Sequence, residues 1–471
     1  MIFPSSNRIA LGLRIALASA ALAASTPASA NGRYPSAGQI LVDPADPRRI
    51  VLRATYGVLT TSDGGERWSW ICEESIGYSG FEDPMLVITG DGSILAGLSS
   101  GLSATHDRGC QWDIAGGGLA DLTLVDVSID RAEPSSAILL GSSVLTGDEI
   151  LTQVWASKDD GRTWAQAGVD LPSAFLGVTL DSAPSDPRRL YVSGRWNGPT
   201  FQGALQRSDD RGETWESFDI PGSDDRNLPY LGAVDPRDAD VVYVRRDGDG
   251  ADALLVSKDG GATWREVFHA VSLLGFALSP DGARIAVGSD MDGLWIAPTT
   301  TLEFTQVGRL GVRCLTWTSD GLFACADELA DGFTAGVSVD GGETFSPILT
   351  LDRLCGPPPA CGRETSTGAT CPALWAATAS FLGVPGRCDA GAGPSAGASG
   401  GDPAAGGAST GTGVGTGAPG AGGGCACDAS GQGRPGALLS CMIAAGGALL
   451  GARRRRARGL RLRAREPRGP V

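Results

Sequence analysis

Six short stretches of the chain place an aspartate, a glycine and an aromatic residue at fixed spacing behind a serine or threonine. One of them, SKDDGRTW at 157–164, sets two adjacent carboxylates beside a tryptophan. Paired carboxylates can serve as acid and base, or hold a cation in a loop. An aspartate before a glycine is also typical of a turn. Recurrence favours the turn, because a residue found once in every unit serves the unit rather than one active site.

The pattern Ser/Thr-x-Asp-x-Gly-x-x-aromatic, called the repeat turn below, starts at residues 61, 105, 157, 208, 257 and 338. A seventh stretch, APTTTLEF at 297–304, keeps the aromatic as Phe304 but lacks the Asp and the Gly. Consecutive starts are 40 to 52 residues apart. Periods near this length are typical of solenoids, propellers and arrays.

The residues around each repeat turn form short strand-like runs. Before and after Ser257 the runs are LPYLGAVDP, DVVYVRRD, ADALLVSKDGGATW and REVFHA, rich in Val, Leu, Tyr and Phe and separated by Asp, Gly and Pro. Four strands of about six residues with their turns fill about 40 residues, as one propeller blade does. The sequence therefore predicts an all-β, seven-bladed β-propeller of four-stranded blades over 39–351, with each repeat turn between the third and fourth strands.

The residue types suit a structural turn. The Asp side chain accepts backbone N–H groups, the Gly adopts a positive φ, and the aromatic ring packs against a neighbouring strand or blade. The residues expected in this structural role are Asp63, Gly65, Trp68, Asp107, Gly109, Trp112, Asp159, Gly161, Trp164, Asp210, Gly212, Trp215, Asp259, Gly261, Trp264, Asp340, Gly342 and Phe345.

The repeat turn resembles the Asp-box, or BNR repeat, of sialidases, xyloglucan-cleaving glycosidases, sortilin-type receptors and photosystem assembly factors. In that superfamily the box is a structural turn remote from the active site. The resemblance covers 39–351 and implies the propeller fold. It does not choose a function, because enzymes and binding proteins share the box.

The N-terminal 30 residues are typical of a cleaved secretory signal. Arg8 and Arg14 lead into an apolar run of small residues that ends at Ala28-Ser29-Ala30. This is the basic, apolar and A-x-A order of a signal peptide. An uncleaved membrane anchor is the alternative, which the shortness of the apolar run disfavours.

The C-terminal part divides into three segments. Residues 352–388 form a Cys-rich module, and 389–424 are nearly all Gly, Ala, Ser, Thr and Pro, which predicts a disordered linker. Within the final segment, 425–471, the run 436–452 is uncharged and can form one transmembrane helix. The Arg-rich tail 453–471 alone would suggest nucleic acid, but its place behind the apolar run favours a stop-transfer role.

Residues 425–471 resemble the myxobacterial C-terminal sorting signal (MYXO-CTERM), with its cysteine motif, apolar helix and arginine cluster. Cys425 and Cys427 match the cysteine motif. The resemblance implies processing near these cysteines and delivery to the bacterial cell surface, where the C-terminal helix would anchor the protein in the membrane.

Charge limits the partners. The net charge is −15, and the basic tail (+8) and the signal (+2) leave about −25 for the exported body. An acidic body argues against nucleic acid. The runs DGDGAD at 247–252 and SDMDG at 289–293 could hold calcium but are more simply hairpin tips. No cofactor or metal site is expected, and the protein is expected to be a monomer.

Eight cysteines in an exported body predict disulfides. Cys314 and Cys325 flank WTSDG and should bond across a hairpin, and Cys72 and Cys110 are expected to pair and staple adjacent blades. The four others are in the module 352–388, where CPALWAATASFLG suits a short helix. These four are Cys355, Cys361, Cys371 and Cys388. Coordination of zinc by these cysteines is the alternative, which is disfavoured because no C-x-x-C pair occurs.

Two classes of function remain. A sialidase needs an Arg-Ile-Pro signature that is absent, and xyloglucan-type enzymes place their carboxylates on two facing propellers, whereas this chain suffices for one. With His106 and His269 as its only histidines, a Ser-His-Asp triad is poorly supported. We therefore assign no catalytic residue and expect a surface-anchored binding module for an unknown carbohydrate or protein ligand. A glycoside hydrolase is the alternative.

One loop carries aromatic residues that could bind a ligand. Trp196 and Phe201 in SGRWNGPTFQG, 193–203, could stack on a sugar or a peptide, or they could pack within the strands. The sequence does not decide between these alternatives.

Overall fold

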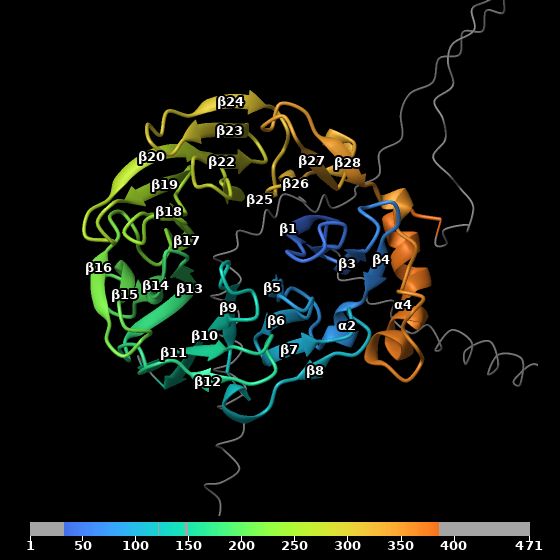
Figure 1. Cartoon of the computed structure of the whole chain (residues 1–471), viewed down its shortest axis with the longest axis horizontal. Helices are drawn as coiled ribbons and strands as arrows, with labels where there is room; N and C mark the ends of the chain where they lie inside the picture. The colour runs from blue at the N-terminus through green and yellow to red at the C-terminus, as the bar shows by residue number, and fades with distance from the viewer. Residues whose placement is uncertain (1–32, 121, 147–148, 386–471) are drawn as a thin grey trace, which may run out of the picture. The chain divides into compact units, whose positions relative to one another are not determined.

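The computed structural model describes residues 33–385, except 121 and 147–148. Twenty-eight strands form seven antiparallel sheets of four strands, arranged around one axis (Figure 1). Within each sheet the strands pair in chain order, so that every blade is a simple meander. The predicted seven-bladed propeller of four-stranded blades is confirmed, and its strands run from Ala37 to Leu349.

The strand bounds follow the sequence repeat closely. Blade 1 contains β1 (Ala37–Val42), β2 (Ile50–Ala54), β3 (Gly57–Thr61) and β4 (Ser69–Ile71), and blade 2 contains β5 (Met85–Ile88), β6 (Ile94–Leu98), β7 (Gly101–Thr105) and β8 (Asp113–Ile114). Blade 3 contains β9 (Leu124–Ile129), β10 (Ala137–Thr146), β11 (Glu149–Ser157) and β12 (Ala165–Gln166). Blade 4 contains β13 (Phe175–Ala183), β14 (Asp186–Trp196), β15 (Gly203–Ser208) and β16 (Glu216–Asp219).

Blade 5 contains β17 (Pro229–Val234), β18 (Val242–Arg246), β19 (Asp252–Ser257) and β20 (Arg265–Ala270). Blade 6 contains β21 (Gly275–Leu278), β22 (Arg284–Ser289), β23 (Gly293–Pro298) and β24 (Thr305–Gly308). Blade 7 contains β25 (Cys314–Thr318), β26 (Gly321–Cys325), β27 (Ala335–Ser338) and β28 (Ser346–Leu349). Short helices α2 (Glu73–Ile76) and α3 (Glu328–Asp331) interrupt loops, and the longer α4 (Ser366–Leu382) follows the last blade.

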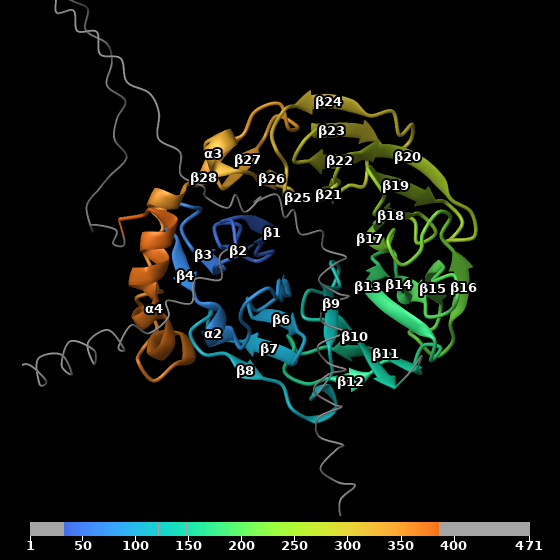
Figure 2. The same cartoon turned by 180° about the vertical axis from the view of Figure 1, so that it is seen from behind.

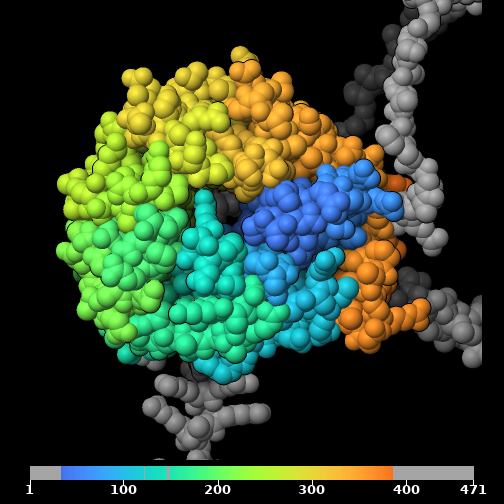
Figure 3. Space-filling model, in the orientation of Figure 1, coloured from blue at the N-terminus to red at the C-terminus, as the bar shows by residue number. Residues whose placement is uncertain are grey.

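The hydrophobic core lies between adjacent blades rather than at the centre. Leu254 and Val256 of blade 5, for example, pack in one cluster with Leu278 and Ile285 of blade 6. Each strand alternates its side chains between its two neighbouring blades, so each sheet is apolar on both faces. The space-filling view shows the blades packed side by side around the axis (Figure 3).

Each intact repeat turn joins the third strand of a blade to the fourth. In blade 3 the Ser157 hydroxyl donates to Asp159 Oδ1 at 2.8 Å and accepts the Gly161 N–H at 3.0 Å. Asp159 Oδ1 also accepts the Thr163 N–H at 2.9 Å. Gly161 has φ 79°, a conformation that side chains resist. Ser and Asp together therefore satisfy the backbone of a tight turn.

The seventh, degenerate turn before Phe304 is irregular. It has no Asp to accept its N–H groups, and its positive φ falls on Leu302, at 57°, instead of on a glycine. Phe304 nevertheless packs against Phe268 of the preceding blade, with ring centroids 4.7 Å apart. The aromatic residue has kept its packing role where the hydrogen bonds of the turn are lost.

The segment after the last blade folds back over the first two blades. Helix α4 lies beside β4 and α2 in both views (Figures 1 and 2). Cys371 in this helix is bonded to Cys72, and Cys361 before it is bonded to Cys110. The expected Cys72–Cys110 staple between blades is therefore wrong, because each of these cysteines faces the C-terminal module and not the other.

The remaining described cysteines are also oxidised. Cys314 and Cys325 are directly opposite in the β25–β26 hairpin and form the predicted disulfide, with Cα atoms 4.9 Å apart. Cys355 is disulfide-bonded as well. Cysteines used in this way cannot ligate zinc, and no cluster of metal-ligating side chains occurs within residues 33–385 as described.

Several expectations fall outside the described residues. They concern the signal peptide 1–30, Cys388, the linker 389–424, Cys425 and Cys427, the apolar run 436–452 and the arginine tail 453–471. In the part of the chain that is described, no helix is long and apolar enough to cross a membrane.

Candidate functional site

The two faces of the disc are built from different loops. Because every blade is a meander, its first and third turns lie on one face, and its second turn and the connection to the next blade lie on the other. The first face carries the repeat turns, which also join neighbouring blades: Arg162 in the turn of blade 3 pairs with Asp91 of blade 2 at 2.6 Å. We call the other face, free of repeat turns, the loop face.

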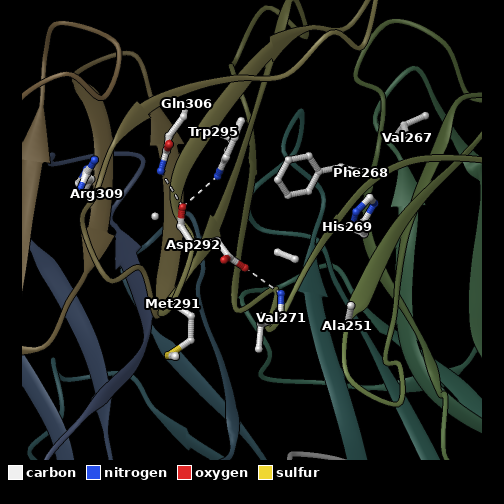
Figure 4. Close-up of a pocket in the computed structure, with 12 residues that line it drawn as sticks. Ala251, Val267, Phe268, His269, Val271, Met291, Asp292, Trp295, Gln306 and Arg309 are labelled. Atoms are coloured by element: carbon white, nitrogen blue, oxygen red, sulfur yellow. Dashed lines mark hydrogen bonds between the residues drawn. The ribbon is translucent and has the colours of Figure 1, made fainter.

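A groove of 930 Å³ lies on the loop face between blades 5 and 6 (Figure 4). Its lining comes from the outer strand β20, the β22–β23 hairpin, and strands β23 and β24. The loop face of a propeller tolerates changes of sequence without loss of the blades, so it is a common place for ligand sites.

Aromatic rings form one wall of the groove. Phe268 of blade 5 and Trp295 of blade 6 lie with ring centroids 5.5 Å apart. Two exposed apolar side chains stand nearby, Val271 at 55 % and Met291 at 67 % exposure. These two side chains extend the apolar wall that the rings form.

The polar centre of the groove is Asp292, in the β22–β23 loop. Its backbone carbonyl accepts the Trp295 indole N–H at 3.1 Å and the Gln306 side-chain amide at 2.8 Å. Its Oδ2 accepts the Val271 backbone N–H at 2.8 Å. The residue is thus held from three sides, by strands β23 and β24 of blade 6 and by the connection from blade 5.

Two further side chains of the lining can donate hydrogen bonds. The exposed side chains of His269 and Arg309 make no hydrogen bond or ion pair with any other residue in the described ranges. In Figure 4 they lie on opposite sides of Asp292. The groove therefore offers stacking surface, one fixed carboxylate and two donor groups, a combination that suits a sugar with its apolar ring face and its hydroxyls.

Hydrolysis of a glycosidic bond would require a second carboxyl group in the site. Glycosidases use two carboxyl groups about 5 to 9.5 Å apart. Among the described residues, Asp292 is the only carboxylate in the groove lining. The groove alone therefore has the composition of a binding site.

Two carboxyl groups with perturbed ionisation lie on the inner strands instead. Burial raises the pKa of Asp126, in β9, to about 7, and its Oδ2 accepts the Leu180 N–H of blade 4 at 2.8 Å. Burial also raises the pKa of Asp181, in β13, which accepts the Ser128 hydroxyl at 3.1 Å. These side chains join the inner strands of blades 3 and 4, so their perturbed pKa values have a structural cause.

The sequence singled out residues that the structure separates from the groove. The eighteen repeat-turn residues lie on the opposite face, or, for Phe345 and the tryptophans, pack beneath that face. His106 bonds Ser93 Oγ at 2.7 Å beside the turn of blade 2. Trp196 packs edge-on against Phe175, with centroids 5.4 Å apart. Phe201 lies under the Arg195 guanidinium at 4.8 Å, with φ 49°.

The groove residues gave a weak signal in the sequence. Asp292 belongs to the run SDMDG, for which the sequence predicts a hairpin tip with calcium binding as the alternative, and the structure confirms the hairpin. Phe268 and Trp295 read as ordinary strand residues. Of the two histidines, His269 proves to line the groove, which its position in REVFHA did not reveal.

Comparison with known proteins supports a sortilin-like propeller. The family model described as Sortilin, neurotensin receptor 3, matches residues 152–293, less than a third of the chain. A xyloglucanase from Hypocrea jecorina is 28 % identical over 216 residues, which are 43 % of this chain and 23 % of the relative. A xyloglucanase from Acetivibrio thermocellus is 38 % identical over 104 residues, 20 % of this chain and 12 % of that protein. The chain thus spans less than a quarter of these relatives.

Solved structures of similar fold include an ancestral GH74 enzyme, with TM-score 0.47 and 13 % identity over 66 % of this chain and 48 % of that one. The GH74 xyloglucanase from Xanthomonas campestris has TM-score 0.34 and 15 % identity over 68 % and 65 % of the two chains. The curated relatives favour the glycoside-hydrolase alternative over the binding-module interpretation that the sequence had suggested.

Proposed function

We propose that the protein acts on a xyloglucan-type polysaccharide as a glycoside hydrolase. The observation that carries this proposal is the sequence similarity to xyloglucanases from Hypocrea jecorina, Acetivibrio thermocellus and Paenibacillus, with 38 % identity over 104 residues in one of them. The relatives are much longer than the matched segments, so the activity is extended to this chain as a hypothesis.

The groove between blades 5 and 6 supports a polysaccharide ligand. A pyranose ring can lie against Phe268 and Trp295, with apolar contacts from Met291 and Val271. Hydroxyl groups can reach Asp292, and the free donors at the two ends of the groove can engage ring or glycosidic oxygens. Its open form suits the interior of a chain rather than a buried terminal sugar.

A second candidate function is binding of the same polysaccharide without cleavage. It is favoured by the single carboxylate of the groove lining, since glycosidases use two. Both candidates place the same class of ligand on the loop face, and they differ in whether a bond is broken.

One experiment separates these functions. The purified exported protein is incubated with xyloglucan, and new reducing ends and released oligosaccharides are measured, with heat-denatured protein and with mannan as controls. In parallel, affinity electrophoresis in gels containing xyloglucan measures binding. Cleavage supports the hydrolase, retardation without cleavage supports the binding function, and absence of both overturns the proposal.

We also propose that the protein works outside the cell while anchored in the membrane by residues 425–471. An acidic propeller held by a linker would meet polysaccharide in the surroundings of the cell. This proposal rests on the sequence of the two ends alone, and the localisation experiment described in the Discussion tests it.

A further inference from the structure

Asp292 is held more firmly than a loop-tip residue needs to be. Besides the three bonds across blades 5 and 6, its backbone N–H donates to Ser289 Oγ at 3.0 Å, and the next residue, Gly293, has φ 83°. Of the two carboxylate oxygens, Oδ2 accepts the Val271 N–H at 2.8 Å and the Ser289 hydroxyl at 3.4 Å. No described residue donates to Oδ1, so a fixed and charged acceptor faces the groove.

The position of this carboxylate matters for the charge of the ligand. In Figure 4 Asp292 lies just below Trp295 and Phe268, while Arg309 and His269 lie to either side. A sugar stacked on the two rings would place its hydroxyls near Asp292 Oδ1. An acidic group at the same place would bring two negative charges together in a partly enclosed groove, which is unfavourable.

We infer that Asp292 orients a neutral pyranose in this groove and excludes polysaccharides that carry carboxylates. This inference rests on the proposed function and adds the residue that sets the charge preference of the groove: Asp292, a preorganised acceptor for sugar hydroxyls. The two flanking donors would contact the neighbouring sugars of the chain. Preorganisation is useful here because little conformational entropy is lost when the ligand binds.

The test compares two ligands that share a backbone. Xyloglucan is compared with xyloglucan whose primary alcohols have been oxidised to carboxylates, by affinity electrophoresis and calorimetry on the full exported protein. We expect the unmodified protein to prefer the neutral polymer by about tenfold or more, the scale of one charge-dependent contact. The preference should shrink at high salt, because salt screens a partly exposed charge.

The decisive variant is Asp292→Asn. The amide oxygen can still accept the Val271 N–H, so the loop should keep its shape, while the charge and the free acceptor are lost. We expect weaker binding of neutral xyloglucan and stronger binding of the oxidised polymer, so that the preference approaches parity. The matched control, Asp320→Asn, removes one exposed carboxylate from the β25–β26 turn on the opposite face and should leave the preference unchanged.

A second variant guards against a folding defect. Met291→Ala truncates a side chain that is 67 % exposed, so the core should be unaffected, and it should weaken binding of both polymers alike. If the unmodified protein binds neither polymer, the proposed function fails. If it binds xyloglucan and Asp292→Asn leaves the preference for the neutral polymer unchanged, this inference is overturned while the proposed function stands.

Discussion

The indole N–H of Trp68, in the first blade, donates a 2.9 Å hydrogen bond to the backbone carbonyl of Ile348, in the last blade. The Trp68 side chain is fully buried, and the residue also pairs with Leu354 in an isolated parallel bridge. The first repeat turn therefore differs from the other five, because it joins the first blade to the last and so closes the ring of blades.

Trp68→Phe should therefore weaken ring closure. The substitution keeps an aromatic ring but removes the donor, leaving the Ile348 carbonyl without this partner, at an expected loss of about 1–3 kcal/mol of unfolding free energy. The control is Trp164→Phe, because the Trp164 N–H bonds only Gly161 within its own turn. Urea unfolding of both variants measures the difference, and an equal loss would show that closure does not depend on this bond.

The two disulfides that join the C-terminal module to the first two blades, Cys72–Cys371 and Cys110–Cys361, should help to hold the ring closed. Cys72–Cys371 closes 299 residues of chain, and Cys314–Cys325 closes 11. In the chain-entropy model the longer loop gives the larger stabilisation, typically about 2–4 kcal/mol. A Cys72→Ser/Cys371→Ser variant should melt at lower temperature than Cys314→Ser/Cys325→Ser and should expose α4 to limited proteolysis. A larger loss from the hairpin pair would contradict this closure role.

The fold could be predicted from the sequence because its information is local and repeated. The positions of Ser257, Asp259 and Gly261 recur with the same spacing in six units, two of which have Thr in place of Ser, and their turn forms within a few residues. Cys314 and Cys325 could likewise be paired because they belong to one hairpin. The partners of Cys72 and Cys110 could not, since the C-terminal module reaches them only through the closed ring.

The groove was hidden for a similar reason. Phe268 and Trp295 lie in strands beside other apolar residues, as ordinary core residues do, and only the packing of blade 5 on blade 6 brings their rings together. Asp292 acquires its role from Val271, Trp295 and Gln306, which approach it from three directions. A site assembled between blades leaves no spacing in the sequence that could reveal it.

Asp159→Ala should destabilise the propeller without changing ligand binding. The variant loses the acceptor for the Thr163 N–H and hydroxyl, which lie at 2.9 and 2.6 Å, and we expect a loss of about 1–3 kcal/mol. Lys158→Ala, at the adjacent exposed position, should cost little. Urea unfolding measures the loss, and affinity electrophoresis on xyloglucan should be unchanged, because the turn lies on the opposite face. Weaker binding at unchanged stability would contradict a structural role.

The same turns should make the protein sensitive to acid. Hydrogen bonds from Thr163 lower the pKa of Asp159 to about 2, and hydrogen bonds from Thr344 lower that of Asp340. A carboxyl whose folded pKa is depressed contributes stability above its unfolded pKa and loses it as pH falls through the folded value. Unfolding free energy should therefore decline as pH drops from about 4 toward 2, with Asp159→Asn reducing the slope.

Replacing Arg453, Arg454, Arg455 and Arg456 with neutral residues should weaken retention of the protein at the cell surface. An arginine block behind an apolar run opposes translocation, so its loss should let the chain pass through the membrane. Immunoblots of cell and medium fractions measure the change, and a variant with the same number of distant arginines replaced is the control. Unchanged localisation would show that the arginine block is not part of the sorting signal. Cell association after deletion of 425–471 would show that the tail is not the anchor.

The last prediction concerns Asp126, whose side chain is 7 % exposed at the seam between blades 3 and 4. Burial raises its pKa to about 7, so the folded protein keeps a proton that the unfolded chain releases near pH 4. Stability from this group is therefore fully present below about pH 4 and lost as pH rises to about 7, with a limiting slope of about 1.4 kcal/mol per pH unit.

Asp126→Asn should remove this slope, because the amide does not titrate. Its single oxygen can accept the Leu180 N–H, but the Val127 N–H that Asp126 Oδ1 accepts at 2.9 Å then loses its acceptor, so the variant should be less stable at low pH. Urea unfolding between pH 4.5 and 7.5 should show a flatter profile than the unmodified protein. Asp181, whose pKa is raised by the same cause, should leave part of the slope in place. Asp159→Asn is the control, since its effect belongs to the window below about pH 4. Parallel profiles for Asp126→Asn and the unmodified protein would mean that Asp126 is already ionised in the folded ring.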